Sequence, residues 1–307
     1  MTKSDKPTFS ILIGLVSTED GDRVLETIDV LGNQEGNHSY EIIIADRMHT
    51  TVSDTIRENY PQITLLPCPP TMSLPMLRTL ALDKAKGEFV AVIEDHNVPS
   101  KNWLVSVYDA FQKASPDTVA VGGCVENGVT GTPLDWATFL CEYSFFLTPV
   151  QEGESDVIPG MNVCYRHSVL KDIDRNLLTS GFWETTVHPV LLQNKQKLYS
   201  TNDIKLFHSK EFSFGLFAKQ RLIYSRYYAG LRFKKSDYLH RMGACAATIA
   251  LPPLLLFRMY KQMRSKGRFF KEFKSALPIL FVFTIIWALG EMQGYILGPG
   301  DALAKIE

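Results

Sequence analysis

Apolar residues in the first part of the chain form short runs that alternate with amphipathic stretches. The runs predict strands over Phe9–Val16, Glu41–Ala45, Ile63–Leu66, Phe89–Ile93 and Val119–Gly122. Apolar positions at helical spacing predict helices over Asp22–Leu31, Ser53–Asn59, Leu74–Lys86 and Trp103–Ala114, with Gly87 as the C-cap of the third helix. Because buried strands alternate with helices, we predict a doubly wound α/β domain with a mostly parallel sheet.

Polar side chains follow three of these predicted strands. Ser17 and Glu19 follow the first strand, Asp46 follows the second, and the run Glu94–His96 follows the fourth. Ligands of open α/β sheets bind at the carboxyl ends of the strands, so we expect these side chains to share one site. Carboxylates together with an imidazole suit Mn²⁺ or Mg²⁺, ions that commonly bridge a protein to a diphosphate.

Glycine-rich phosphate loops are missing from the sequence. No GxGxxG follows the first strand, which disfavours a dinucleotide-binding fold, and no GxxxxGK[ST] occurs, which excludes a P-loop. The predicted site therefore holds a diphosphate through a metal ion.

The C-terminal third alternates apolar and basic segments. Met242–Phe257 and Ser275–Gly290 carry no charge, and the stretch between them is rich in cations and contains one acid, Glu272. Its cations are Arg258, Lys261, Arg264, Lys266, Arg268, Lys271 and Lys274. The pattern indicates a lipid bilayer as a partner. We therefore predict a catalytic domain over residues 1–215, and a basic interface segment with two hydrophobic membrane helices over residues 216–307.

The two apolar segments differ in their fitness to cross a membrane, which takes about 20 apolar residues. Met242–Phe257 is shorter than that, contains Pro252 and Pro253, and has basic flanks on both sides, so we predict that it is interfacial or re-entrant. Ala276–Leu297 is long enough to cross, provided that Glu291 has a partner or lies at the interface. We expect the catalytic domain at the cytoplasmic face of the cell membrane.

The net charge and the cysteine spacing argue against a nucleic-acid-binding protein and against a disulfide or zinc framework. A net charge of −1 argues against a nucleic-acid partner, which would favour a basic chain. The 5 cysteines are widely spaced and form no CxxC pair, so they indicate buried thiols in a reducing compartment.

Several segments together carry a resemblance to a known family. FSILIGLV, EIIIADR and LPMLRTLALDKAKGEFVAVIEDH are similar to the opening strands of a family 2 glycosyltransferase with a GT-A fold, and the resemblance extends to residue 208. It implies that Asp46 contacts the nucleobase and that Arg78 approaches the nucleotide.

The family's metal-binding DxD motif appears in this chain in an altered form. The resemblance places Glu94, Asp95 and His96 there, and it leaves open whether Glu94 and His96, or Asp95, hold the ion. The segment IKLFH resembles the strand that ends in a histidine near the metal, which implies a ligand role for His208, although a lone histidine can also be structural.

Two later segments complete the resemblance. IPGMNVCYRHSVL is similar to the block beside the donor sugar and acceptor, which implies that Gly160 and Asn162 shape the sugar pocket. SGFWETTVHPVLLQNKQKLY is similar to the block with the acidic general base, which maps to Glu184. Trp183 could stack on a sugar or pack in the core, and His188 lies one helical turn beyond Glu184, where it could face the same cleft.

The resemblance implies an inverting, metal-dependent glycosyltransferase that uses a nucleotide-diphosphate sugar. Its acceptor would be a glycan or a lipid-linked molecule, as in polysaccharide biosynthesis. The QxxRW motif of the processive, polymerising members of the family is missing, and Gln220 and Arg221 match it only in part. We therefore expect the transfer of single sugars. Two alternatives remain open: a polyprenyl-phosphate glycosyltransferase, whose acceptor needs no base, and a catalytically silent membrane scaffold, suggested by the altered DxD and by Thr185 in place of an acid.

Overall fold

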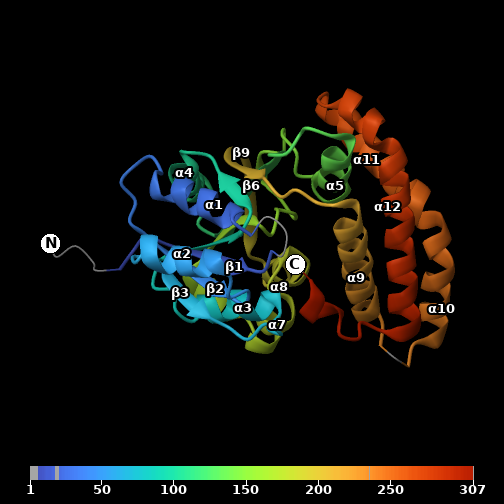
Figure 1. Ribbon diagram of the computed structural model, residues 1–307, viewed down its shortest axis with the longest axis horizontal. Helices are drawn as coiled ribbons and strands as arrows, with labels where there is room; N and C mark the ends of the chain where they lie inside the picture. The colour runs from blue at the N-terminus through green and yellow to red at the C-terminus, as the bar shows by residue number, and fades with distance from the viewer. Residues whose placement is uncertain (1–5, 18–20, 235, 307) are drawn as a thin grey trace. The chain divides into compact units, whose positions relative to one another are not determined.

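A computed structural model describes residues 6–17, 21–234 and 236–306 (Figure 1). The chain forms two compact units. Unit 1 comprises Met1–Gly128 and Phe146–Lys210, and unit 2 comprises Val129–Phe145 and Glu211–Glu307. A segment from the middle of the chain thus groups with the C-terminal helices, and the division at residue 215 stays a prediction.

Unit 1 is built on one mixed sheet, which has nine strands within the described residues. The strands are β1 (Phe9–Leu15), β2 (Tyr40–Asp46), β3 (Thr64–Pro67), β4 (Phe89–Glu94), β5 (Asn97–Pro99), β6 (Thr118–Asn127), β7 (Gly153–Glu154), β8 (Asn162–Arg166) and β9 (Lys197–His208). Their order is β3-β2-β1-β4-β8-β6-β9-β5, and β7 pairs with β9. This arrangement confirms the predicted α/β class.

The strands of this sheet are parallel on one side and include an antiparallel strand in the middle. Strands β3, β2, β1 and β4 are parallel, as the alternation of strands and helices predicts. Strand β8 then lies antiparallel between β4 and β6, and β9 pairs parallel with β6. The central strands β1 and β4 are almost wholly buried, which explains their continuous apolar sequences.

The first four helices of unit 1 lie where the sequence predicts helices, and the later ones fall beyond the predicted elements. They are α1 (Arg23–Gly32), α2 (Thr51–Asn59), α3 (Leu74–Leu82), α4 (Trp103–Lys113), α6 (His167–Lys171), α7 (Arg175–Gly181) and α8 (Glu184–Gln193). A capping box between Thr50 and Ser53 begins α2, and Pro75 in the first turn suits the start of α3.

The prediction for the end of α3 is wrong. The helix stops at Leu82 rather than Lys86, so Gly87 is not its C-cap. Gly87 instead lies against β1, where its N–H donates to Ser10 Oγ at 2.8 Å. A Cβ at this position would lie 2.6 Å from the Ser10 nitrogen, so the close approach of the two backbones requires glycine.

Unit 2 is helical in the part of the chain that the structure describes. It contains α5 (Pro133–Tyr143), α9 (Phe214–Arg232), α10 (Tyr238–Ala247), η1 (Thr248–Ala250), α11 (Leu251–Lys266), α12 (Phe270–Leu297) and η2 (Ala302–Lys305). Helix α12 packs against α5, α9, α10 and α11. The helical stretch Tyr238–Lys266, with 29 residues, and α12, with 28, are both long and apolar enough to cross a membrane.

Helices α9 and α12 approach each other through small residues. A Cβ on Gly290 would lie 2.5 Å from the carbonyl oxygen of Leu222, and one on Gly294 would lie 2.5 Å from that of Arg226. This spacing of two glycines, four residues apart, is typical of closely packed helices. It fixes α9 along the second half of α12.

The acid within the apolar sequence of α12 has the partners that it requires. Glu291 pairs with Arg232 of α9 at 3.3 Å, and it accepts hydrogen bonds from Trp287 Nε1 at 3.1 Å and the Tyr295 hydroxyl at 3.0 Å. Nearby, the buried Arg221 of α9 pairs with Glu142 of α5 at 3.1 Å. These polar contacts join three helices of unit 2.

Candidate active site

Three strand ends of unit 1 converge on one group of side chains. Strand β1 pairs with β4 so that Gly14 lies opposite Glu94, which brings Ser17 near the residues that follow β4. The short strand β5 comes directly after His96 and pairs with β9, with Asn97 opposite His208. Strand β5 therefore places His208, from a distant part of the sequence, beside His96.

Glu94, His96 and His208 form a cluster that could hold a metal ion, because their ligand atoms all lie within 4.8 Å of one another. The Nε2 atoms of the two histidines are 3.1 Å apart, and His96 Nε2 lies 3.4 Å from Glu94 Oε2. The two imidazole rings meet edge to face, with centroids 4.7 Å apart.

These separations fit a single ion. Nitrogen and oxygen ligands lie about 2.0–2.2 Å from a first-row divalent metal, so two ligands at right angles are about 3 Å apart. The distances of 3.1 and 3.4 Å therefore match neighbouring positions of one coordination shell. Two imidazoles and a carboxylate are also a donor set that divalent transition metals accept.

Asp95 lies outside this cluster and behind His96. Its carboxylate accepts hydrogen bonds from the backbone N–H groups of Val16 and Ser17 at 2.8 and 2.9 Å, and from Ser17 Oγ at 2.8 Å. It also lies 2.7 Å from His96 Nδ1. Such a contact fixes the proton on Nδ1 and leaves Nε2 to face the cluster, an arrangement common around metal-binding histidines.

Neighbouring charges in this group lower the pKa of both carboxylates. Burial favours the neutral form of Glu94, but its contacts with His96 and Arg78 outweigh burial and lower its pKa to about 2. Asp95 behaves likewise: burial opposes ionisation, yet the hydrogen bond and charge of His96 hold its pKa well below the usual range.

The two histidines shift in opposite directions. Burial favours neutral His96, but its hydrogen bonds to Asp95 and Glu94 outweigh burial and raise its pKa. Burial and the charge of His96 lower the pKa of His208. The group thus holds two carboxylates that stay ionised, which is the charge that a divalent cation requires.

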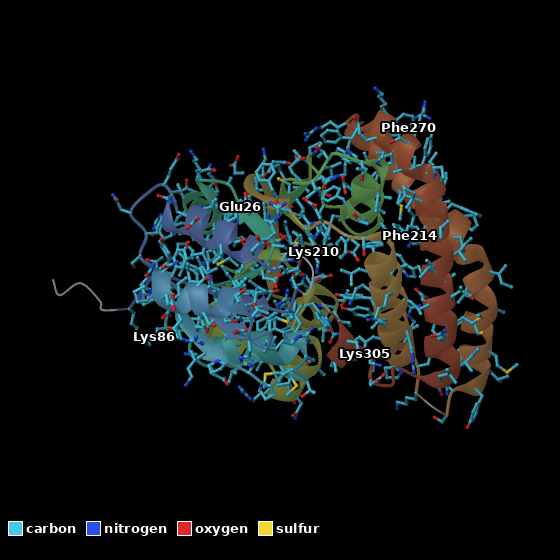
Figure 2. The ribbon with its side chains drawn as sticks, in the orientation of Figure 1. Glu26, Lys86, Lys210, Phe214, Phe270 and Lys305 are labelled. Atoms are coloured by element: carbon cyan, nitrogen blue, oxygen red, sulfur yellow. The ribbon has the colours of Figure 1, made fainter. Side chains whose placement is uncertain are left out.

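The sequence pattern alone did not single out Lys210, a buried cation in the same group. Lys210, labelled in Figure 2, comes after the end of β9 at His208, and its Nζ donates to Ser17 Oγ at 3.3 Å. Its charge also lowers the pKa of Asp95. The only signal in the sequence is its place two residues after His208, which a surface lysine could share.

Arg78 connects this cluster to the segment that precedes Glu184. Its side chain is buried, with NH2 3.4 Å from Glu94 Oε1 and NH1 donating to the Phe182 carbonyl at 3.0 Å. The guanidinium thus contacts one residue of the metal-competent cluster and the loop that leads into α8. Two segments far apart in the sequence are held together by this one side chain.

Glu184 begins α8 and lies against Gly160. A Cβ on Gly160 would lie 2.0 Å from Glu184 Oε2 and 3.0 Å from its backbone nitrogen, so the glycine leaves the space that the carboxylate occupies. Burial, followed by the charge of Glu184, raises the pKa of Tyr165. The Tyr165 hydroxyl lies 2.9 Å from His188 Nε2. The structure therefore brings Gly160 and Glu184 together, and their predicted roles in sugar binding and as the base stay predictions.

Three predicted sugar-binding residues lie in the interior of unit 1. Asn162 is fully buried: Nδ2 donates to the carbonyls of Cys124 and Ile204 at 2.9 and 3.1 Å, and Oδ1 accepts from Trp103 Nε1 at 2.8 Å. Trp183 and His188 are also buried, at 3% exposure each. The amide of Asn162 therefore joins β8 to β6 and β9, and its role in the sugar pocket stays a prediction.

Two further predicted residues flank the group. Asp46, buried at the end of β2, caps the following turn by accepting the N–H groups of Met48 and His49 at 2.7 and 3.2 Å through Oδ1. The adjacent strand β1 places Leu15 opposite Asp46, so this carboxylate lies near the same sheet edge as Ser17. Glu19 lies outside the described residues.

A comparison with protein families decides the identity of this domain. The model of "Glycosyl transferase family 2" matches residues 15–174, more than half of the 307 residues. The chain belongs to this family. The matched range includes the strand ends that carry Ser17, Asp46 and Glu94–His96, and it ends before Glu184 and His208.

Solved glycosyltransferase structures share the fold. The mannosyltransferase PcManGT from Pyrobaculum calidifontis, in complex with GDP-Man and Mn²⁺, has a TM-score of 0.56 at 15% identity, covering 92% of this chain and 86% of that one. TarS from S. aureus gives 0.51 at 14% identity, covering 88% of this chain and 54% of that one. GalNAc-T7 with UDP, GalNAc and Mn²⁺ gives 0.52 at 14% identity, covering 69% and 45%. No curated protein sequence matches.

These likenesses confirm the GT-A fold and, with the family match, a glycosyltransferase. In this family 2 chain the fold explains why chemistry gathers at one sheet edge: parallel strands deliver their following residues to the same side. The antiparallel β5–β9 pair then adds His208 from beyond the matched range.

Proposed function

We propose that this protein is a metal-dependent, inverting glycosyltransferase that moves a single sugar from a nucleotide-diphosphate donor to a glycan or lipid-linked acceptor. The observation that carries the proposal is the cluster of Glu94, His96 and His208 at the carboxyl edge of the sheet, with separations that suit one ion. Solved relatives in fold were crystallised with Mn²⁺ and either GDP-Man or UDP, which supports this class of donor.

Each residue of the group has a role that its contacts support. Glu94, His96 and His208 would hold Mn²⁺ or Mg²⁺, which when bound neutralises charge on the leaving diphosphate. Asp95 fixes the ring of His96 through Nδ1. Arg78 and Lys210 add fixed positive charge beside the same carboxylates.

Glu184 is the proposed general base. It would take the proton from the acceptor hydroxyl as the oxygen attacks the anomeric carbon, while the bond from that carbon to the diphosphate breaks on the opposite face. Gly160 leaves the space in which this carboxylate sits. Arg78 joins the loop before Glu184 to Glu94, which supports a common site for the donor and the base.

Asp46 and Ser17 would serve the nucleoside part of the donor. Both follow strands at the same sheet edge, and the turn after Asp46 is fixed by its Oδ1. We further propose that unit 2 attaches the enzyme to the cytoplasmic face of a membrane, where nucleotide sugars are available. Two helices long and apolar enough to cross a bilayer support this association.

A polyprenyl-phosphate acceptor is a second candidate, favoured by the basic segment between the apolar helices of unit 2. A phosphate oxygen is already ionised, so transfer to it would not need Glu184. The silent-scaffold alternative has less support, because the altered motif still brings three metal-competent ligand atoms within 4.8 Å of one another.

Calorimetry with GDP and UDP tests the proposal. The protein should bind one of them at least about tenfold more tightly with Mn²⁺ than with EDTA, because the ion links the diphosphate to the protein. His208→Ala should remove most of the Mn²⁺ effect, whereas His240→Ala, an exposed histidine of unit 2, should not. Absence of binding to every nucleoside diphosphate would support the scaffold, and Mn²⁺-independent binding would contradict the metal site.

A further inference from the structure

The helices of unit 2 expose apolar side chains along two faces. In the most apolar 18-residue segment of the stretch Tyr238–Lys266, 17% is buried, and in that of α12, 39% is buried. On the first stretch the exposed apolar residues follow one side of the helix: Leu239, Met242, Ala246, Ile249, Pro253 and Phe257. Leu239 and Ile249 are 85% and 84% exposed, which is unusual for side chains of this size in water.

Toward its C-terminal end, the same side of this helix carries exposed basic residues. Lys261 and Arg264 follow the apolar residues at helical spacing, and both are exposed. Arg258, Lys266, Arg268, Lys271 and Lys274 add to the charge around the turn between α11 and α12. A helix with an apolar side and adjoining cations fits the surface of a bilayer that contains anionic lipids.

Helix α12 is packed on protein along both of its halves. At its start, Phe269 lies 4.7 Å from Trp136 of α5, centroid to centroid. Further along, Phe283 lies 4.5 Å from Phe217 of α9, and Arg221 of α9 lies 4.0 Å from the ring of Trp287. Glu291 near its end pairs with Arg232 of α9.

The two supporting helices are tied to unit 1 by short connections. Val129–Thr132 leads from Gly128 into α5, and Ser144 with Phe145 leads back to Phe146 of unit 1. Glu211–Ser213 leads from Lys210 into α9. Because both ends of the short helix α5 return to unit 1, α5 stays on the same side of a bilayer as unit 1.

Crossing by α12 would therefore carry polar helices into the hydrocarbon. Helix α9 contains Lys219, Arg221, Arg226 and Arg232 without an acid of its own, and it is not among the helices apolar enough to cross. Charged side chains at that depth are costly, and α5 is too short to span. The length of α12 suits crossing, but its packing does not.

We propose that unit 2 is monotopic: its helical hairpin lies in one leaflet of an anionic bilayer, with the stretch Tyr238–Lys266 in the membrane plane, and neither helix crosses. This deepens the membrane association of the proposed function and rests on it. It differs from the expectation from the sequence, in which Ala276–Leu297 is apolar and long enough to cross provided that Glu291 has a partner or lies at the interface. The turn after Lys266 and the C-terminal residues then lie on the same side as the catalytic unit.

Cysteine accessibility in cells that produce the full chain distinguishes the possible topologies. In a Cys245→Ser background the remaining cysteines are buried. Single cysteines at Ser265, beside the hairpin turn, and at Asp301, after α12, are compared with one at the exposed Lys101 of unit 1. An impermeant maleimide is applied to intact cells and then to lysed cells.

The proposal expects all three cysteines to react from the same side. If only Ser265→Cys reacts from the side opposite Lys101→Cys, both helices cross, and if only Asp301→Cys does so, α12 crosses alone. If both react from the opposite side, Tyr238–Lys266 crosses alone; each of these results overturns the proposal. A chain that remains in the soluble fraction would overturn membrane association itself. Nucleotide binding, measured separately, reports on the catalytic part of the proposed function.

A second measurement tests the in-plane surface. Ile249→Glu, at an exposed position, should weaken flotation with vesicles of phosphatidylcholine and phosphatidylglycerol roughly ten- to hundredfold, because one apolar side chain no longer enters the bilayer. Met76→Glu, at an exposed position on α3 of unit 1, is the matched control and should float like the wild type. Unchanged binding by Ile249→Glu would exclude this surface.

Discussion

The Nε2 atoms of His96 and His208 face each other at 3.1 Å, although 112 residues separate them in the chain. Strand β5 accounts for this meeting, because it follows His96 directly and pairs with the end of β9. Two neutral ring nitrogens at this distance need either a shared proton or a cation between them. In the proposed site a divalent ion would supply the cation, and the neighbouring carboxylate of Glu94 would supply the opposite charge.

Asp95→Asn tests the indirect role of this carboxylate. The asparagine side chain has no negative charge, so it can no longer form charge-assisted hydrogen bonds with His96 Nδ1 and with the N–H groups of Val16 and Ser17. Loss of such a supporting contact typically weakens metal affinity about 10- to 100-fold. Mn²⁺-dependent nucleotide binding should fall by this factor, while binding in EDTA changes little.

The control for Asp95→Asn is Ser17→Ala, which removes one of the hydrogen bonds to Asp95 and leaves its charge. We expect a smaller loss of Mn²⁺ affinity from this variant. Equal losses of nucleotide binding with and without Mn²⁺ would show that Asp95 does not act through a metal ligand.

The sequence predicted the first half of unit 1 well, because short-range patterns determine it. Strands β1 and β4 are buried on both sides and therefore read as continuous apolar runs, and the helices between strands show clear periodicity. The antiparallel insertion of β8 between β4 and β6 depends on pairing between distant segments. No local pattern reports such pairing.

The candidate site shows the same division between local and distant information. The resemblance indicated Glu94–His96 as a metal-binding run, but one sequence could not tell which of these side chains point together. The structure shows that Glu94 and His96 point toward the same group because strand β5, which follows His96, pairs with the end of β9 at His208. Asn162 shows the opposite case: a residue type suited to sugar binding is used to join strands through its amide.

Glu184→Gln tests the base. Removal of a general base typically costs about 10²- to 10⁴-fold in rate, so kcat for transfer to a hydroxyl acceptor should fall by that amount while donor binding is retained. Initial rates with saturating donor measure the change. Full activity would contradict the base role and favour a phosphate acceptor.

Gly160→Ala probes the position of the same carboxylate. The added methyl group would lie 2.0 Å from Glu184 Oε2, so the side chain must move away. We expect kcat to fall while Mn²⁺-dependent nucleotide binding persists. Gly215→Ala, at a helical position of unit 2 with open space around its Cβ, is the matched control and should retain activity. A Gly160→Ala enzyme with normal kcat would show that Glu184 need not be held at this place.

Asp46→Ala tests nucleoside recognition. A hydrogen bond from the base to a charged carboxylate contributes about 1.5–3 kcal/mol, so nucleoside diphosphate affinity should fall roughly ten- to hundredfold. Because Asp46 also caps the turn at Met48 and His49, Asp46→Asn serves as the second variant: it keeps an acceptor for the turn and removes the charge. Unchanged affinity in both variants would exclude the nucleobase role.

The stability of the fold should depend on pH through His188. Burial lowers the pKa of His188 to about 3, far below its ordinary value near 6.5, so the folded state holds the ring neutral. The unfolded chain takes up a proton as the pH falls below about 6.5, and the folded chain does not. Stability is therefore full above that pH and is lost as the pH falls from about 6.5 toward 3, by at most about 1.4 kcal/mol per pH unit.

Substitution of the ring tests this dependence on pH. His188→Phe should be less stable than the wild type at pH 7.5, because the contact with the Tyr165 hydroxyl at 2.9 Å is lost. The difference should shrink or reverse by pH 4.5, since phenylalanine binds no proton. Thermal unfolding in detergent across this range measures the difference, and His240→Phe, at an exposed histidine, controls for general acid effects. Parallel pH profiles for wild type and His188→Phe would show that His188 takes up a proton equally in both states, in conflict with its buried position on α8.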